Sequence, residues 1–84
     1  MDNQHKVQIR AFVVDALRNR GDNGELADHE SLFISGRLDS LSMLMLVAHL
    51  EAEFDIDFAT VDFDVSLIDS IDEIEALVRE KAAL

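Results

Sequence analysis

The sequence predicts an all-α fold: a small bundle of three main helices plus one short helix, with a long connection after the first helix. Proline is absent from the 84 residues and only five are aromatic, so both helix breakers and typical strand residues are scarce. Apolar residues recur at spacings of three and four, and no stretch combines strict alternation with hairpin turn residues. We expect residues 1–84 to form a single domain, because a chain of this length supports one core.

The first helix is expected at residues 3–19. Its apolar residues cover a wide arc of the helical wheel, which indicates packing on more than one side; they are Val7, Ile9, Ala11, Phe12, Val13, Val14, Ala16 and Leu17. The helix should end in "RGDNGE", where two glycines flank Asp-Asn. A long connection follows at residues 21–38, and connections of this length are often functional. We expect its apolar stretch "SLFI", residues 31–34, to anchor it to the core, and Gly36 to permit a close approach before the next helix.

The second helix is expected at residues 39–54, "DSLSMLMLVAHLEAEF". Spacings of three and four predict an inward stripe, widened by Met43 and Leu46; the stripe consists of Leu41, Leu44, Val47, Ala48, Leu50 and Phe54. The outward face is less polar than a solvated face normally is, and it consists of Ser42, Met45, His49, Ala52 and Glu53. After this helix, residues 55–64, "DIDFATVDFD", leave room for a short helical turn.

The last helix is expected at residues 70–82. Its apolar stripe is regular and consists of Ile71, Ile74, Leu77, Val78 and Ala82. Glu75 and Arg79 are four residues apart in the favourable order for an ion pair on a helix.

Two helix starts nearly repeat each other, "RLDSLSMLM" at residues 37–45 and "LIDSIDEIE" at residues 67–75. Ser70 is followed three residues later by Glu73, the pattern of a capping box, so its hydroxyl already has a structural role. Ser40 has no such partner, and Asp39 is the better N-cap for its helix. Ser40 should therefore lie at the first helical position with a free hydroxyl, where the helix N-terminus would stabilise an attached phosphate.

The charge of the chain restricts its partners. Seven Lys or Arg against eighteen Asp or Glu give a net charge of -11, which repels nucleic acids and anionic lipids. The sequence contains no cysteine and no long apolar run, so we expect no disulfides and no membrane insertion. The charged N-terminus does not look like a secretory signal. These features predict a cytoplasmic monomer that binds proteins with basic patches.

Residues 36–58, "GRLDSLSMLMLVAHLEAEFDIDF", resemble the modification site and second helix of acyl carrier proteins. The signature of these proteins is Gly, then Asp-Ser-Leu or Asp-Ser-Met, then an apolar helix that ends in acidic residues and Phe. The resemblance extends to the length, the acidity, Val7, the long first loop with Phe33, and Phe54. It implies a small acyl-carrier-like helical bundle.

The resemblance also implies a 4'-phosphopantetheine arm esterified to Ser40, with Asp39 and Leu41 beside it in transferase recognition. A phosphopantetheinyl transferase supplies such arms from coenzyme A, with a magnesium ion on the transferase. The thiol of the arm then holds an acyl or aminoacyl group as a thioester, which a loading ligase attaches and a downstream transferase or synthase uses. The carrier itself would catalyse nothing. The sequence leaves the cargo open between fatty acyl, polyketide, D-alanyl and other aminoacyl groups.

One departure from the family pattern concerns the partners. Carriers of fatty acid synthesis usually place acidic residues two, five and twelve positions after the serine, whereas this chain has Ser42, Met45 and Ala52 there. "GRLDSL" and "EFDIDFATVDFD" are instead similar to D-alanyl and other specialised stand-alone carriers. We therefore expect a dedicated partner enzyme that recognises apolar surface on the second helix; the expected contact residues are Leu41, Ser42, Leu44, Met45 and Ala48.

Three alternative interpretations compete with the carrier. An unmodified acidic module that binds a basic protein surface is the main competitor of the carrier. A hydrolase is disfavoured because Ser40 and His49 are nine residues apart on one helix. They would lie about 14 Å apart along its axis, too far to share a proton. Spacing does not exclude His5 or His29 as a catalytic partner. Four aspartates could hold a cation, but they alternate with apolar residues and lack the glycine of a calcium loop, so a solvated face is expected; they are Asp55, Asp57, Asp62 and Asp64.

Overall fold

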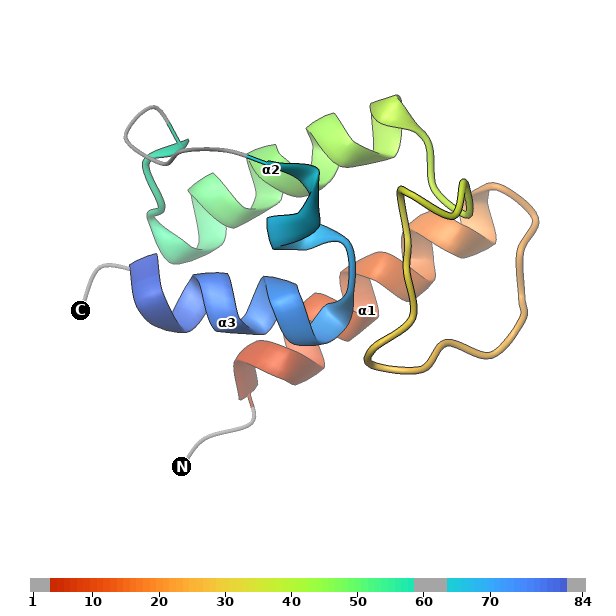
Figure 1. The fold of residues 1–84 in the computed structure, drawn as a ribbon, viewed down its shortest axis with the longest axis horizontal. Helices are drawn as coiled ribbons and strands as arrows, with labels where there is room; N and C mark the ends of the chain where they lie inside the picture. The colour runs from red at the N-terminus through yellow and green to blue at the C-terminus, as the bar shows by residue number, and fades with distance from the viewer. Residues whose placement is uncertain (1–3, 59–63, 82–84) are drawn as a thin grey trace.

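The computed structural model describes residues 4–58 and 64–81, and these residues form an all-helical domain (Figure 1). It contains α1 (Gln4–Asn19), α2 (Ser40–Phe54) and α3 (Ile71–Lys81), with the 3-10 helix η2 (Val65–Ile68) before α3. The described residues include no strand. The prediction of an all-α bundle with a long first connection is confirmed.

The predicted helix boundaries agree with the observed ones within two residues. Asn3 and Ala82, the predicted outer ends of the first and last helices, lie outside the described residues. The short turn predicted within residues 55–64 falls largely on residues 59–63, which also lie outside them, and η2 follows at residues 65–68. None of the helices described is long and apolar enough to cross a membrane.

The core is aliphatic apart from one phenylalanine and draws on every helix and on the connection between α1 and α2. Its buried side chains are Ile9, Val13, Leu17, Leu32, Leu38, Leu46, Leu50, Phe54, Ile56, Ile68, Ile71, Ile74, Leu77 and Val78. The predicted stripe of α3 is confirmed for its four described members. The buried face of α1 is narrower than predicted. Its buried residues are Ile9, Val13 and Leu17, at spacings of four, and Val7 is 63% exposed.

The predicted inward stripe of α2 is confirmed at Leu46, Leu50 and Phe54 but is wrong at Leu41, Leu44 and Ala48. The buried residues repeat every four positions, at Ser42, Leu46, Leu50 and Phe54, whereas Leu41 is 65% exposed and Leu44 67% exposed, and Ala48 is also exposed. Nearly every position between 41 and 50 is apolar, so the sequence is compatible with more than one buried face. The neighbouring elements decide which face packs, and they leave an apolar surface exposed.

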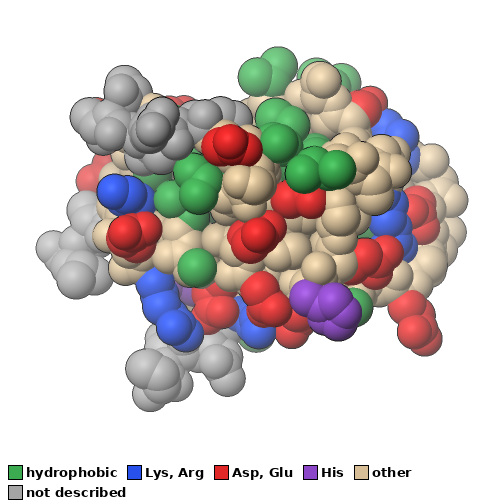
Figure 2. Space-filling view, in the orientation of Figure 1, with side chains coloured by type: hydrophobic (Ala, Val, Ile, Leu, Met, Phe, Trp, Pro, Cys, Tyr) green, Lys and Arg blue, Asp and Glu red, His purple; other side chains and the backbone are tan. Residues whose placement is uncertain are grey.

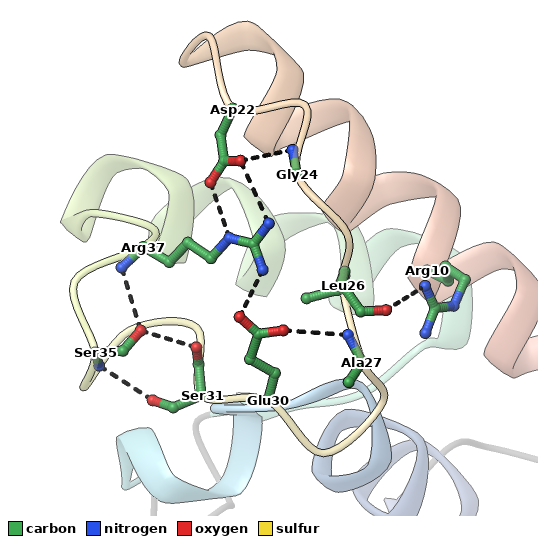
Figure 3. A network of polar contacts seen from close by, with 9 residues as sticks. All are labelled: Arg10, Asp22, Gly24, Leu26, Ala27, Glu30, Ser31, Ser35 and Arg37. Atoms are coloured by element: carbon green, nitrogen blue, oxygen red, sulfur yellow. Dashed lines mark hydrogen bonds and ion pairs between the residues drawn. The ribbon is translucent and has the colours of Figure 1, made fainter.

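The connection between α1 and α2 is held by charged side chains at both ends (Figure 3). At the α1 end, Gly21 adopts a positive φ of 84°, and the N–H of Asp22 donates to the Leu17 carbonyl oxygen at 2.9 Å, which closes the helix as the glycine predicted. Arg37 then bridges Asp22 at 2.8 Å and Glu30 at 2.7 Å. The guanidinium of Arg37 and the Gly24 N–H lower the pKa of Asp22 to about 2.

The middle of the same connection is fastened to the start of α3 by Asp69. This carboxylate is only 7% exposed and accepts hydrogen bonds from the Ser31 hydroxyl at 2.6 Å and from the backbone N–H groups of Phe33 at 2.7 Å and Ile34 at 3.0 Å. Burial alone would raise the pKa of Asp69, but these donors hold it below its usual value. Leu32 is fully buried beside this anchor, as the apolar stretch predicted, although Ile34 is 69% exposed.

Candidate functional site

The centre of the candidate site is Ser40, at the first turn of α2. Asp39 is the N-cap of this helix, as predicted, with extended backbone (φ -105°, ψ -177°) and a carboxylate that accepts from the Ser42 N–H at 2.9 Å. Ser40 is the first helical residue and is exposed. Within residues 4–58 and 64–81, no side chain or backbone group hydrogen-bonds to its hydroxyl. The predicted position of this hydroxyl is therefore confirmed.

Electrostatics near Ser40 combine a carboxylate with a cation from α1. The second carboxylate oxygen of Asp39 accepts from the Arg20 guanidinium at 2.7 Å. The Ser42 N–H is the main cause, and Arg20 a smaller one, of a pKa of Asp39 below its usual value. Asp39 is thus ionised at neutral pH, and it holds the C-terminal end of α1 against the N-terminal end of α2. Figure 1 shows these two helix ends at the same side of the molecule.

The second Asp-Ser pair has the structural role that the sequence predicts. The Glu73 N–H donates to the Ser70 hydroxyl oxygen at 3.2 Å, and that hydroxyl donates to the Glu73 carboxylate at 3.3 Å. Glu73 therefore reaches back to the side chain of Ser70 instead of its backbone N–H, which the capping box would predict. Ser70 is 5% exposed, so its hydroxyl is both engaged and buried, in contrast to that of Ser40.

The expected partner-contact residues of α2 separate into two groups. Leu41, Leu44, Met45 and Ala48 are exposed, and we call these four residues the apolar α2 surface. Figure 2 shows hydrophobic side chains gathered along the top of the molecule over α2, with acidic side chains across the face below. Ser42 is the exception, because it is 9% exposed and therefore lies beneath this surface.

A groove of about 230 Å³ lies beside Ser40, between α1 and α2. Its α1 side carries Phe12, Ala16, Asn19 and Arg20, together with Asp15. Its α2 side carries Asp39 and Leu41, the two neighbours of Ser40, together with Ser42 and Met45. Sequence reasoning missed both the groove and Arg20, because Arg20 and Asp39 are nineteen residues apart and no local spacing connects them.

His49 packs between helices instead of facing outward. His49 was expected to face outward, but its ring stacks on Phe12 with centroids 4.3 Å apart, and its Nε2 is buried without a hydrogen-bond partner within residues 4–58 and 64–81. The described residues contain no group of three His, Asp or Glu placed to hold a metal ion. Of the four aspartates considered for a cation, Asp64 caps η2 through the Ser66 N–H at 2.9 Å, and Asp62 lies outside the described residues.

Comparison with known proteins identifies a family. A family model described as "phosphopantetheine attachment site" matches residues 7–78, which include α2, η2 and most of α1 and α3. No curated protein and no solved structure matches the chain significantly.

Proposed function

This chain belongs to the phosphopantetheine attachment site family, and from this premise we propose that it is a carrier protein whose Ser40 holds a 4'-phosphopantetheine arm. The arm supplies a thiol that binds an acyl or aminoacyl group as a thioester. The observation that carries the assignment of Ser40 is the contrast between its exposed, unpartnered hydroxyl and the buried, hydrogen-bonded hydroxyl of Ser70.

The first turn of α2 suits a phosphodiester on Ser40. The first intrahelical bond runs from the Met43 N–H to the Asp39 carbonyl oxygen at 3.0 Å, and N–H groups ahead of it have no partner inside the helix. These groups and the helix dipole favour an anion at this position. Asp39 keeps the helix start in place, and it leaves the Ser40 hydroxyl free for a transferase to reach.

The apolar α2 surface is proposed as the contact site for partner enzymes, namely the phosphopantetheinyl transferase, a loading ligase and a downstream transferase or synthase. Large apolar side chains at high exposure are typical of interaction sites when they are contiguous. Met45 takes a position where fatty-acid carriers usually have an acidic residue, so recognition here is expected to depend on apolar burial more than on charge. Ser42, one of the contacts expected from the sequence, is only 9% exposed, and we leave it out of the proposed contact site.

The carrier interpretation is favoured over an unmodified interaction module because the family is defined by the attachment of an arm to a serine. Carriers of this kind are not catalysts, and we propose the same for this chain, as a monomer in the cytoplasm. An acidic surface with a net charge of -11 suits brief encounters with basic enzymes, since long-range attraction speeds association.

The assignment of Ser40 is tested by incubating the apo protein with coenzyme A and a broad-specificity phosphopantetheinyl transferase. The intact mass of wild type and of Ser70→Ala should rise by one 4'-phosphopantetheine, and that of Ser40→Ala should not change. Absence of a mass gain in the wild type, or a gain that persists in Ser40→Ala, would overturn the proposal.

The apolar mode of recognition is tested with a fatty-acid ketosynthase and an acidic-ridge carrier as the reference. The wild-type protein should bind the ketosynthase more weakly than the reference carrier, and Met45→Glu should bind it more tightly than wild type. Ala52→Glu, also at an exposed position of α2, serves as a second gain-of-charge variant. Wild-type binding as tight as that of the reference would contradict a specialised partner.

A further inference from the structure

We propose that the groove between α1 and α2 receives the arm carried by Ser40, and that Arg20 is the residue that positions it there. The inference rests on the proposed function and adds a resting place for the arm on the protein. A group attached to Ser40 starts at the edge of the groove, because Asp39 and Leu41, on either side of Ser40, both line it. A tether this short gives a high effective concentration.

The groove combines one cation and apolar side chains with the carboxylates of Asp15 and Asp39. The phosphodiester at the Ser40 end is an anion, and the guanidinium of Arg20 lies 2.7 Å from the carboxylate of the adjacent Asp39. A guanidinium has five N–H donors, so Arg20 can donate to a phosphodiester and keep its bond to Asp39. Beyond the phosphodiester, Asn19, next to Arg20, can hydrogen-bond to the hydroxyl or the first amide of the arm, and Phe12 and Met45 offer apolar contacts to its methyl and methylene groups.

A second hollow does not fit. It lies on η2 and α3 and is lined by Ser66, Leu67, Glu73, Ala76, Leu77 and Glu80. Both hollows are lined by two carboxylates, but this one lacks a cation, and none of its lining residues neighbours Ser40. The three cations within α1, Lys6, Arg10 and Arg18, do not line the groove between α1 and α2. Arg20, which directly follows α1, lines it and forms its ion pair with Asp39 beside Ser40.

The test compares amide ¹H–¹⁵N spectra of the full-length apo and modified proteins, after intact mass has shown complete modification. Docking predicts shifts for Ala16 and Asn19 in α1, which are far from Ser40 in sequence, and none for Leu67 and Ala76 at the other hollow. Isotope-filtered NOEs should connect the methyl groups of the arm to the Phe12 ring. Shifts confined to residues 38–44, without such NOEs, would overturn the inference.

Arg20→Gln separates the positioning role from attachment. This variant should gain the same mass as wild type, but the equilibrium constant for docking should fall by about two- to fivefold, the factor expected for losing an exposed ion pair. The shifts of Ala16 and Asn19, which follow the docked fraction, should decrease accordingly. Arg18→Gln is the matched control, because Arg18 is exposed on the same helix and does not line the groove. Equal shifts in Arg20→Gln and wild type would refute the role of Arg20. A protein that gains no mass would refute the proposed function instead.

Discussion

Replacing Asp69 by asparagine tests how the long connection is held against the bundle. The carboxylate is nearly fully buried and accepts three hydrogen bonds, two of them from the backbone of Phe33 and Ile34. Hydrogen bonds to a charged group contribute about 1.5–3 kcal/mol, against about 0.5–1.5 kcal/mol for neutral pairs. Loss of the charge from the two backbone bonds should therefore cost about 2 kcal/mol. The Ser31 hydroxyl can turn to accept from the new amide.

The asparagine variant is preferable to alanine for this measurement. Asp69→Ala would leave two partly buried N–H groups without their acceptor, at up to about 1–3 kcal/mol each. Domains are stable by only about 0.05–0.15 kcal/mol per residue. Such a loss would approach the whole stability of this chain. For Asp69→Asn, urea unfolding followed by circular dichroism should show the loss directly, and the melting temperature should fall by about 8–16 °C.

Asp72→Asn is the matched control, because its carboxylate is 51% exposed and pairs with Lys6 at 3.1 Å. Exposed ion pairs contribute at most about 1 kcal/mol, so this variant should lose clearly less stability than Asp69→Asn. Equal losses for the two variants would refute the reasoning that burial and backbone bonding make Asp69 the anchor.

Three further predictions concern stability. Ser70→Ala should lower the free energy of unfolding by about 1 kcal/mol, the cost of an N-cap, while modification by the transferase stays complete. In urea unfolding, Leu46→Ala should lower the free energy of unfolding by about 2–5 kcal/mol and Leu44→Ala by less than about 1 kcal/mol. The reason is that Leu46 is 1% exposed and Leu44 67% exposed. A larger loss for Leu44→Ala than for Leu46→Ala would support the buried face predicted from the sequence. Asp22 and Asp69 have pKa values below their usual range in the folded chain, that of Asp22 at about 2. Their ionised forms thus stabilise the fold fully above the unfolded pKa of about 3.9, and this contribution is lost as the pH falls toward 2. The urea midpoint of unfolding should therefore fall between pH 5 and pH 2. This fall should be less steep in Asp69→Asn, which lacks one of the two carboxylates.

The sequence was sufficient for the features that depend on local spacing. The capping positions of Asp39 and Ser70, the regular stripe of α3 and the glycine that ends α1 all follow from residues within a few positions of one another. The Glu75 and Arg79 pair, observed at 3.2 Å, belongs to the same class. The free hydroxyl of Ser40 could be predicted because its rival, Ser70, has a partner three residues away.

The features that were missed depend on contacts between distant segments. The buried face of α2 could not be chosen from a helix that is apolar on nearly every side, so tertiary packing decides it. The stacking of His49 on Phe12 joins two helices, and the Arg20 ion pair joins two helix ends across the long connection. None of these contacts has a local pattern, so the groove beside Ser40 becomes visible only in the fold.

The central claim, that Ser40 is the attachment site, is tested most directly by locating the arm in the chain. Digestion after glutamate separates residues 31–51, which contain Ser40, from residues 54–73, which contain Ser70. In protein modified by the transferase, fragment masses of the first peptide should show residues 31–39 unchanged, residues 31–40 heavier by one 4'-phosphopantetheine, and residues 41–51 unchanged. An arm on the peptide of residues 54–73, or on residues 41–51, would contradict the account.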